Sequence, residues 1–323
     1  MTSFISVIIP TYNREKMLSI TIDSFLNQLY PKDRYEIIVA NNNSTDKTQE
    51  VINDYLKYEN VKTIFEPRQG VHYARNSAAK ISRGDYLYYT DDDMMADENL
   101  LKNLVQVFLD NPNVASATGK VIPKWKIVPP QWVSSNLNNM WLSLNDLGDG
   151  TIVSDKDIGV FSCHQMMKRE IFFHAGGFNP ENTAGEWIGD GETGLNIKIK
   201  ELNGMFAYVG ASIIWHMIPP SRMTQKYLNK RIGNQGNCDS YTDYKKNRYN
   251  KFVLFKQSIK FSIYAFCRFL KYLFRFYEIE RFFFVRLHKA YAFYYINRVK
   301  YTLKLIFSKR WRNLVLKDNW LDD

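Results

Sequence analysis

Three consecutive carboxylates, Asp91, Asp92 and Asp93, follow an uncharged run of apolar and aromatic residues at 86–90. Such a run is typical of a strand buried on both faces of a parallel sheet. In an open α/β sheet, ligands bind outside the carboxyl ends of the strands, where these carboxylates would lie. Side chains two apart in an extended segment point the same way, so we expect Asp91 and Asp93 to converge while Asp92 faces elsewhere. Like charges so close need a cation, and carboxylate oxygens suit Mg²⁺ or Mn²⁺.

The triplet alone leaves one alternative open, a solvated acidic turn that caps a helix starting near Asp97. Two more acids, Asp190 and Glu192, stand where another predicted helix begins, near its positive N-terminal end. In isolation they are explained as ordinary helix-start acids. His216 ends a predicted strand and is a candidate ligand, although a structural role is the commoner explanation for a histidine placed by position alone.

The elements that would position these residues alternate between strand and helix with short connections. Buried runs and period-3.6 patterns predict strands at 4–9, 35–40, 61–65 and 86–90 and helices at 15–28, 47–57, 71–82 and 97–109. Leu29 is expected to face inward with the first helix. Later residues predict strands at 114–122 and 205–215 and a helix at 192–202. This pattern indicates an α/β fold with a mostly parallel, Rossmann-like central sheet flanked by helices.

Three of the predicted strands end in polar loops, around Asn13, Asn41 and Asp91, which would gather along one edge of the sheet. No glycine-rich dinucleotide loop or P-loop is present in the sequence, so those two nucleotide sites are disfavoured. A nucleotide held through a metal and polar strand-end groups remains compatible. The three cysteines are far apart, which gives no readable disulfide framework or metal site and suits a reducing compartment. The N-terminal residues do not resemble a secretory signal.

The net charge of +10 is unevenly distributed along the 323 residues. Residues 245–312 hold 18 Lys or Arg and two acids, whereas the rest of the chain holds 25 basic and 31 acidic residues. Twenty aromatic residues also lie between 252 and 311. A helix through this region has a basic face with Lys256, Lys260, Arg268, Lys271 and Arg275, and an opposite apolar face with Phe255, Ile259, Phe266, Phe269, Leu270, Leu273 and Phe276.

A basic amphipathic helix rich in aromatic residues is typical of a helix that lies in a membrane interface and is attracted to anionic lipid. No run in this tail reaches the roughly 18 uncharged apolar residues that a spanning helix needs. We therefore expect residues 252–312 to bind an anionic membrane surface. The alternatives are a helical subdomain that only packs on the core and a nucleic-acid-binding tail. The latter is disfavoured because the upstream half offers no nucleic-acid module.

Taken together, these segments resemble a family 2 glycosyltransferase of the GT-A fold. The resemblance spans roughly residues 3–236 and rests on motifs that occur in the family's order. These motifs are residues 6–14, 36–46, Ala74-Arg75-Asn76, 84–93, Gly176-Gly177-Phe178, Gly189-Asp190-Gly191-Glu192, and His216 with Arg222. The implied organisation is a GT-A domain at 1–236, with a nucleotide-binding half at 1–122 and an acceptor-binding half at 123–236, followed by a helical, basic, membrane-associating region at 237–323.

The resemblance also implies roles for individual residues. The acidic triplet is similar to the family's Asp-x-Asp motif, which makes Asp93, Asp91 and His216 the expected ligands of Mn²⁺ or Mg²⁺ and Arg222 a diphosphate contact. The segment with Asp190 and Glu192 is similar to the site of the catalytic base, and Asp190 is the preferred candidate. The residues expected to bind the donor nucleotide are Pro10, Thr11, Tyr12, Arg14, Asn41, Asn43, Arg75, Asp91 and Asp92.

Two positions depart from the family pattern. The family usually has Asp where this chain has Asn41, which leaves the nucleobase open, and its base motif is more often Glu-Asp, whereas here a glycine separates the two acids. The implied activity is inverting transfer of a sugar from a nucleoside diphosphate, with a UDP-sugar as first candidate, to a glycan or lipid-linked hydroxyl during surface polysaccharide synthesis. The expected location is cytoplasmic, peripheral at the inner face of the cell membrane. A metal-dependent nucleotidyltransferase and a non-catalytic sugar- or membrane-binding scaffold are the alternatives.

Overall fold

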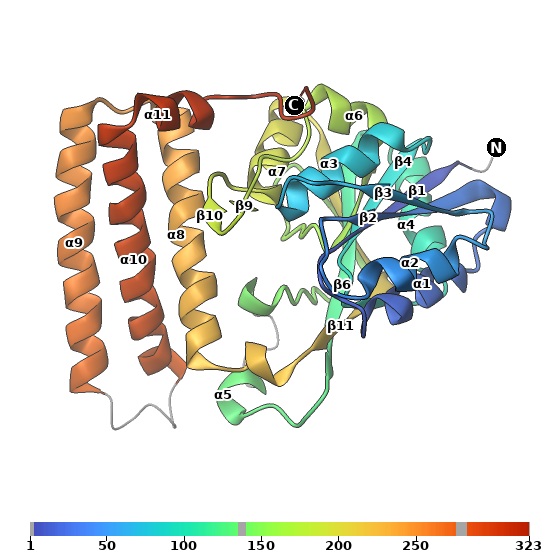
Figure 1. Ribbon diagram of the computed structural model, residues 1–323, viewed down its shortest axis with the longest axis horizontal. Coiled ribbons are helices and arrows are strands. Elements are labelled where there is room, and N and C mark those ends of the chain that lie inside the picture. Colours follow the sequence, from blue (N-terminus) through green and yellow to red (C-terminus); the bar gives the residue numbers. More distant parts are fainter. Residues whose placement is uncertain (1–2, 135–139, 276–282, 323) are drawn as a thin grey trace.

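The computed structural model describes residues 3–134, 140–275 and 283–322. Figure 1 shows a sheet covered by helices, with three long helices standing side by side next to it. These three helices are α8 (Gln225–Asn247), α9 (Lys251–Phe274) and α10 (Phe283–Phe307). The fold class predicted from the sequence, an α/β GT-A-like domain with a C-terminal helical extension, is confirmed.

The first part of the sheet is parallel. Its strands β1, β2, β3 and β4 pair in the order β3-β2-β1-β4 and are connected by helices. The elements of this part are β1 (Ile5–Thr11), α1 (Leu18–Leu26), a short 3-10 helix (Lys32–Arg34), β2 (Tyr35–Asn41), α2 (Thr48–Tyr55), β3 (Val61–Phe65), α3 (Val71–Ile81) and β4 (Tyr86–Thr90). The strands end at the same edge of the sheet because they run in the same direction.

The second part of the sheet is mixed rather than parallel. β8 lies between β4 and β6 and is antiparallel to both, β11 is parallel to β6, and β5 and β7 are antiparallel to β11. Its elements are β5 (Met94–Ala96), α4 (Leu100–Asp110), β6 (Val114–Trp125), α5 (Gln131–Ser134), a 3-10 turn (Met140–Leu142), β7 (Thr151–Ser154), β8 (His164–Lys168), α6 (Arg169–His174), α7 (Glu192–Glu201), β11 (Met205–Ile218) and a 3-10 turn (Pro220–Arg222).

The sheet separates two hydrophobic layers, and alternation along each strand assigns its side chains to one or the other. In β1, Ile5, Val7 and Ile9 pack with helices α1, α2 and α4, whereas Ile8 packs on the opposite face with α3, α6 and α7. All four side chains are fully buried, and full burial of each contributes roughly 1.5–3 kcal/mol. Leu29 is 59% exposed, so the expectation that it faces inward is wrong. The reason is that α1 ends at Leu26, three residues earlier.

The predicted helix cap by the acidic triplet is also absent from the described residues. β5 lies between Asp93 and α4, and α4 begins only at Leu100. The backbone N–H of Asn99 is instead bonded by the side chain of Asp97 at 3.0 Å. The acidic turn therefore has no capping function, and its three carboxylates are available for other contacts.

The helical extension is built from well-capped helices. The side chains of Thr224, Asn250 and Ser308 accept N-cap hydrogen bonds at the starts of α8, α9 and α11 (Lys309–Val315). α8 crosses the predicted domain boundary at 236/237 without a break, and the division into two domains stays a prediction. No helix in the described ranges is both long enough and apolar enough to cross a membrane.

Candidate active site

The strand-end loops surround a cavity of about 580 Å³. Among the residues predicted to bind the donor, those lining this cavity are Pro10, Thr11, Tyr12, Arg14, Asp91 and Asp92, together with Asp93 and Arg222. The polar residue after β2 that lines the cavity is Asn42, whose Oδ1 accepts from the Gly70 backbone N–H at 2.8 Å. The convergence of strand ends that the sequence predicted is therefore present.

Asn41 and Asn43 do not line this cavity. Asn41 is buried, its side chain donating to Gln49 at 2.7 Å and accepting from the backbone of Ser44 at 3.0 Å. Asn43 takes a positive φ of 62°, which Asn tolerates better than most residues. Both residues shape the turn, and this turn presents Asn42 to the cavity instead.

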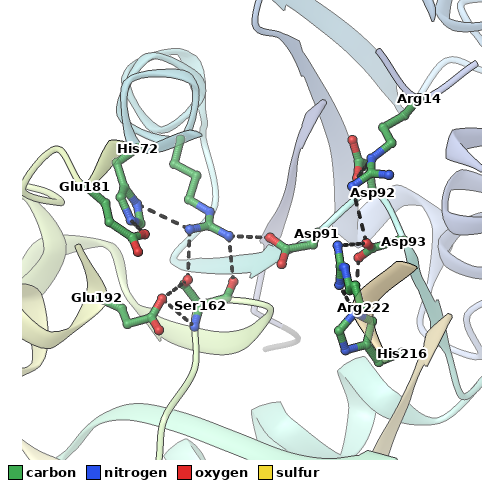
Figure 2. A network of polar contacts seen from close by, with 11 residues as sticks. Arg14, His72, Asp91, Asp92, Asp93, Ser162, Glu181, Glu192, His216 and Arg222 are labelled. Atoms are coloured by element: carbon green, nitrogen blue, oxygen red, sulfur yellow. Dashed lines mark hydrogen bonds and ion pairs between the residues drawn. The ribbon is translucent and has the colours of Figure 1, made fainter. Parts of the chain in front are cut away.

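Each member of the acidic triplet has an arginine partner (Figure 2). Arg75 Nη2 lies 2.5 Å from Asp91, Arg14 Nε lies 3.2 Å from Asp92, and Arg222 Nη2 lies 2.7 Å from Asp93. Arg14 Nη2 is also 3.6 Å from Asp93. Each of the three acidic side chains is thus paired with at least one guanidinium group.

The expectation that Asp91 and Asp93 converge while Asp92 faces elsewhere is wrong. Asp92 and Asp93 share Arg14, whereas Asp91 turns toward Arg75 (Figure 2). The reason is local: β4 ends at Thr90, and residues 91–93 form a turn, so the two-residue alternation of an extended strand does not apply.

His216 approaches Asp93 from β11, with Nε2 3.8 Å from the carboxylate. Its Nδ1 lies 2.8 Å from the Leu142 carbonyl oxygen, which can only accept, so Nδ1 carries the proton. Burial lowers the pKa of His216 and keeps the ring neutral. The Nε2 lone pair therefore faces Asp93 and Arg222, where it accepts from Arg222 Nη1.

The two buried members of the triplet, Asp92 and Asp93, have pKa values that are shifted in opposite directions. Burial, and then the charge of Asp93, raise the pKa of Asp92 to about 7. Burial also disfavours the charged form of Asp93, but the guanidinium groups of Arg222 and Arg14 favour it, and the pKa of Asp93 is lowered. Asp93 is consequently the carboxylate that stays ionised.

The metal-binding chemistry is present only in part. Asp93 and His216 provide an oxygen and a nitrogen ligand close together, but Asp91 is held by Arg75, so the predicted three-ligand set is not assembled. No group of three or more His, Cys, Asp or Glu side chains suited to a metal is found in the described part of the chain. The donor types nevertheless fit Mn²⁺ or Mg²⁺, although the lone pair of His216 Nε2 is bonded by Arg222 in this structure.

A second cavity of about 200 Å³ adjoins the first and shares Val71, Asp91 and Arg222 with it. Glu192, the first residue of α7, lines this cavity and accepts a hydrogen bond from Ser162 Oγ. Ser162 Oγ in turn accepts from Arg75 Nη1 at 2.8 Å. Arg75 thereby connects Asp91 of the donor cavity to Glu192 of the second cavity (Figure 2).

A second acid stands beside Glu192 in this cavity. Glu181 lies 3.3 Å from His72 Nε2, and His72 Nδ1 lies 3.3 Å from Arg75. Burial, and then the charge of Glu181, raise the pKa of Glu192. A carboxylate with a raised pKa is a stronger proton acceptor, so the arrangement suits general base chemistry.

Asp190 lines neither of these cavities. It is 4% exposed, and its two oxygens accept from Asn179 Nδ2 at 2.6 Å and from Thr242 Oγ1 at 2.8 Å. The geometry therefore favours Glu192 over Asp190, because both oxygens of Asp190 are bonded by Asn179 and Thr242 and Asp190 lines neither cavity.

Sequence reasoning missed Ser162, Glu181, His72 and Arg231, which line or support the second cavity. His72 and Glu181 stand close to recognised motifs, two residues before Ala74 and three residues after Phe178, but neither belongs to one. Ser162 and Glu181 lie in loops with no periodic signal, and Arg231 belongs to α8, where its positive charge is one of many.

The model of glycosyl transferase family 2 matches residues 6–173, just over half of the chain. The chain belongs to this family. A mannosyltransferase from Pyrobaculum calidifontis, solved with GDP-Man and Mn²⁺, superposes with a TM-score of 0.54 at 19% identity, covering 73% of this chain and 63% of that one. At that identity, the likeness concerns the fold.

Two curated members of the family are similar over shorter stretches. The poly(ribitol-phosphate) beta-glucosyltransferase of Bacillus spizizenii is 42% identical over 102 residues, which are 30% of this chain and 16% of that protein. A dolichyl N-acetyl-glucosaminyl phosphate glucuronosyltransferase (a diacetamido-dideoxy sugar transferase) of Methanococcus voltae is 33% identical over 124 residues, 36% of this chain and 39% of that protein. The matched segments thus span well under half of both relatives, which are transferases of lipid-linked or polymeric glycans.

Proposed function

We propose that this glycosyltransferase moves a sugar from a nucleoside diphosphate to an acceptor hydroxyl with inversion at the anomeric carbon. The observation that carries the proposal is the pair of adjoining cavities that share Asp91 and Arg222. One cavity offers strand-end groups to a nucleotide, and the other offers Glu192 to an acceptor. An inverting transfer needs this separation, because the leaving diphosphate and the attacking hydroxyl with its base lie on opposite sides of the reacting carbon.

The donor cavity supports binding of a nucleoside diphosphate through its own side chains. Pro10, Thr11, Tyr12 and Asn42 line the part formed by β1 and β2, and Tyr12 is 46% exposed, which leaves its ring free to stack on a base. Arg14 and Arg222 line the cavity beside the triplet, and they are the cations that would face a diphosphate there. A UDP-sugar remains the proposed donor.

We assign Asp93 and His216 as the residues that would hold Mn²⁺ or Mg²⁺, with Asp91 as a further candidate after release from Arg75. Such an ion supplies positive charge for the departing diphosphate. Arg222 bonds both His216 and Asp93, so it must turn away from them to make room for the ion, and it lines both cavities. There it provides a second positive charge for the leaving group.

Glu192 is the proposed general base. It accepts the proton of the attacking hydroxyl, while Ser162 and Arg75 fix its orientation through the hydrogen bonds described above. The charge of Glu181 strengthens Glu192 as a base by raising its pKa. This arrangement brings a carboxylate with a raised pKa to the acceptor side of the site.

The acceptor is proposed to be a glycan or lipid-linked saccharide in surface polysaccharide synthesis. Support comes from the two curated relatives, whose names specify poly(ribitol-phosphate) and a dolichyl phosphate-linked sugar. The test is turnover of a panel of nucleotide-sugars with Mn²⁺, with analysis of the released nucleotide. A nucleoside diphosphate is expected; release of pyrophosphate would replace the proposal by nucleotidyl transfer, and no turnover with any donor would argue for a binding scaffold.

We also propose that α9 binds an anionic membrane at the cytoplasmic face. Its inner side packs on α10 through Leu254, Ser258, Phe261, Ala265 and Tyr272, and this leaves its outer side uncovered. Large apolar side chains there are 44–65% exposed: Phe252, Phe255, Ile259, Ile263, Phe266, Phe269 and Leu273. Lysines and arginines flank them, which suits anionic lipid rather than a neutral surface. Phe276 of the predicted apolar face lies outside the described residues.

Flotation of the full chain with vesicles tests this surface. We expect co-flotation with vesicles that contain phosphatidylglycerol but not with pure phosphatidylcholine, and loss of flotation in Phe255→Asp/Phe266→Asp. The control is Leu29→Asp, which changes an exposed leucine (59%) of the catalytic part. Absence of flotation with both vesicles, or equal loss in the control, would contradict membrane binding. A concentration-dependent dimer or an RNA shift that depends on Phe255 would assign the surface to those partners.

A further inference from the structure

A third cavity, of about 430 Å³, lies between α8, α10 and the hairpin formed by β9 (Asn182–Thr183) and β10 (Glu186–Trp187). Figure 1 shows this hairpin next to α8, between the helical extension and the sheet. The two turn residues Ala184 and Gly185 line both this cavity and the donor cavity. The volume is within the range of sites that bind small organic molecules.

Three amides from two helices point into this cavity. Asn234 and Asn237 lie one turn apart on α8, and Asn297 faces them from α10. Asn234 is 9% exposed, and the other two are half-buried. None of the three side chains makes a hydrogen bond with another described residue. An amide can donate two hydrogen bonds and accept two, so these groups are unsatisfied by the protein itself.

The close packing of the two helices fixes the positions of the amides. A Cβ at Gly236 would lie 2.3 Å from the backbone oxygen of Tyr294, and one at Gly233 would lie 3.0 Å from Asn297 Nδ2. Only glycine at these positions allows α10 to approach α8 so closely. The amides therefore sit on a rigid helix pair rather than on a mobile loop.

The remaining walls hold aromatic rings and charged side chains, of which Lys300 has no ion pair among the described residues. Trp187 is half-buried and lines the cavity together with the buried ring of Tyr301, whose hydroxyl donates to the Ile188 carbonyl. Lys304 is paired with Glu186. Hydrogen-bonding amides beside an aromatic face match a polyhydroxylated ring, which has hydroxyl groups at its edge and C–H groups on its face.

We propose that this cavity is a saccharide subsite that holds an acceptor chain one or more sugars away from the reacting hydroxyl. The ligand class is an oligosaccharide, because the groups without a partner among the described residues are three amides and Lys300, all of which can bond hydroxyl groups. The chain would pass over the Ala184-Gly185 turn between the subsite and the transfer site. This inference rests on the proposed glycosyl transfer for its role, whereas saccharide binding itself requires no turnover.

The test uses the full-length protein on an array of immobilised oligosaccharides and, separately, in transfer assays with the acceptors found. We compare the wild type with Asn234→Ala/Asn297→Ala and with Gln235→Ala. Gln235 is an amide on the same turn of α8, but it is exposed and bonded to Asp239 at 2.8 Å. Unfolding temperatures of the three proteins are recorded first, because the exchanged amides have no protein partner and little stability change is expected.

We expect the double variant to bind oligosaccharides roughly tenfold more weakly, from the loss of two hydrogen-bonding groups. Its KM should rise by the same factor for long acceptors only, with kcat unchanged, and Gln235→Ala should behave as the wild type. Equal binding by the double variant, or no binding of any oligosaccharide by the wild type, would overturn the subsite. Oligosaccharide binding that depends on the amides, without any transfer, would keep the subsite and refute the proposed function. Transfer by the double variant with an unchanged KM would keep the proposed function and refute the subsite.

Discussion

Replacing Glu192 by Gln should abolish most of the transfer activity while leaving donor binding intact. The amide has nearly the same size and still accepts the hydrogen bond from Ser162, so the cavity wall is preserved. What is lost is the acceptor of the hydroxyl proton. General base catalysis contributes roughly 10²–10⁴-fold, so kcat should fall by that factor, which corresponds to about 2.7–5.5 kcal/mol of barrier.

The matched variant is Asp190→Asn, two residues earlier. Asp190 is buried, and the hydrogen bonds that it accepts from Asn179 and Thr242 connect the loop before α7 to the Asn179 loop and to α8. Asn retains one acceptor, and the Thr242 hydroxyl can rotate to accept from the new amide nitrogen. Burial raises the pKa of Asp190, so removing the charge offsets part of the lost bonding. We expect kcat within about threefold of wild type and a stability change of about 1 kcal/mol.

Both variants are assayed by release of nucleoside diphosphate with saturating donor and acceptor. Donor binding is followed by the rise in unfolding temperature with nucleotide and Mn²⁺, which reports affinity for the folded state. The assignment requires that Glu192→Gln keeps this rise and loses turnover. If Asp190→Asn loses turnover to the same extent while Glu192→Gln remains active, the geometric argument is refuted and the base is Asp190.

Three further predictions concern charge. Glu181→Gln removes the negative charge that helps to raise the pKa of Glu192. Because a general base must be deprotonated to act, the acid limb of the pH–rate profile should move to lower pH. An unchanged acid limb would show that Glu181 does not tune the base. Arg222→Gln removes the nearest positive charge from buried Asp93, so the free energy of unfolding in guanidinium chloride without metal should fall by about 3 kcal/mol. Mn²⁺ should restore part of this stability, and a loss that Mn²⁺ does not reduce would argue against Asp93 as a ligand. Burial lowers the pKa of His164 to about 4 from 6.5. As the pH falls, the unfolded chain therefore binds this proton before the folded chain does, and the free energy of unfolding should fall by about 3 kcal/mol between pH 6.5 and 4. In His164→Gln, the loss of unfolding free energy over the same interval should be smaller by that amount.

The parallel half of the fold could be predicted from the sequence because each strand is a short apolar run between polar loops. The strands at 61–65 and 86–90 have the predicted boundaries, and the strand ends surround the donor cavity. Both faces of β4 are buried, so its composition alone marks it, whereas β3 is an edge strand in which only Val61 is buried. The polar residues that follow these strands lie at one edge of the sheet because the strands are parallel, and no side-chain contact needs to be known to predict this.

β8 could not be predicted, and it changes the sheet from parallel to mixed. Its residues His164 and Gln165 are polar yet fully buried. His164 Nδ1 lies 2.7 Å from the Tyr88 hydroxyl, and Gln165 donates to Ser116 and Asn196 at 3.0 Å. Those partners are 31 to 76 residues away, so the hydrogen bonds that allow burial are visible only in the folded chain.

The choice between Asp190 and Glu192 shows most clearly where sequence reasoning ends. Both acids adjoin the start of α7, and a helix start favours either of them. Gly191 between them has φ 56° and ψ −125°, a conformation that side chains disfavour, and an added Cβ would lie 2.5 Å from His72 Nε2. This turn directs Asp190 toward α8 and Glu192 into the cavity. The glycine that separates the acids in the sequence, and that looked like a departure from the family pattern, therefore decides which of them can reach an acceptor.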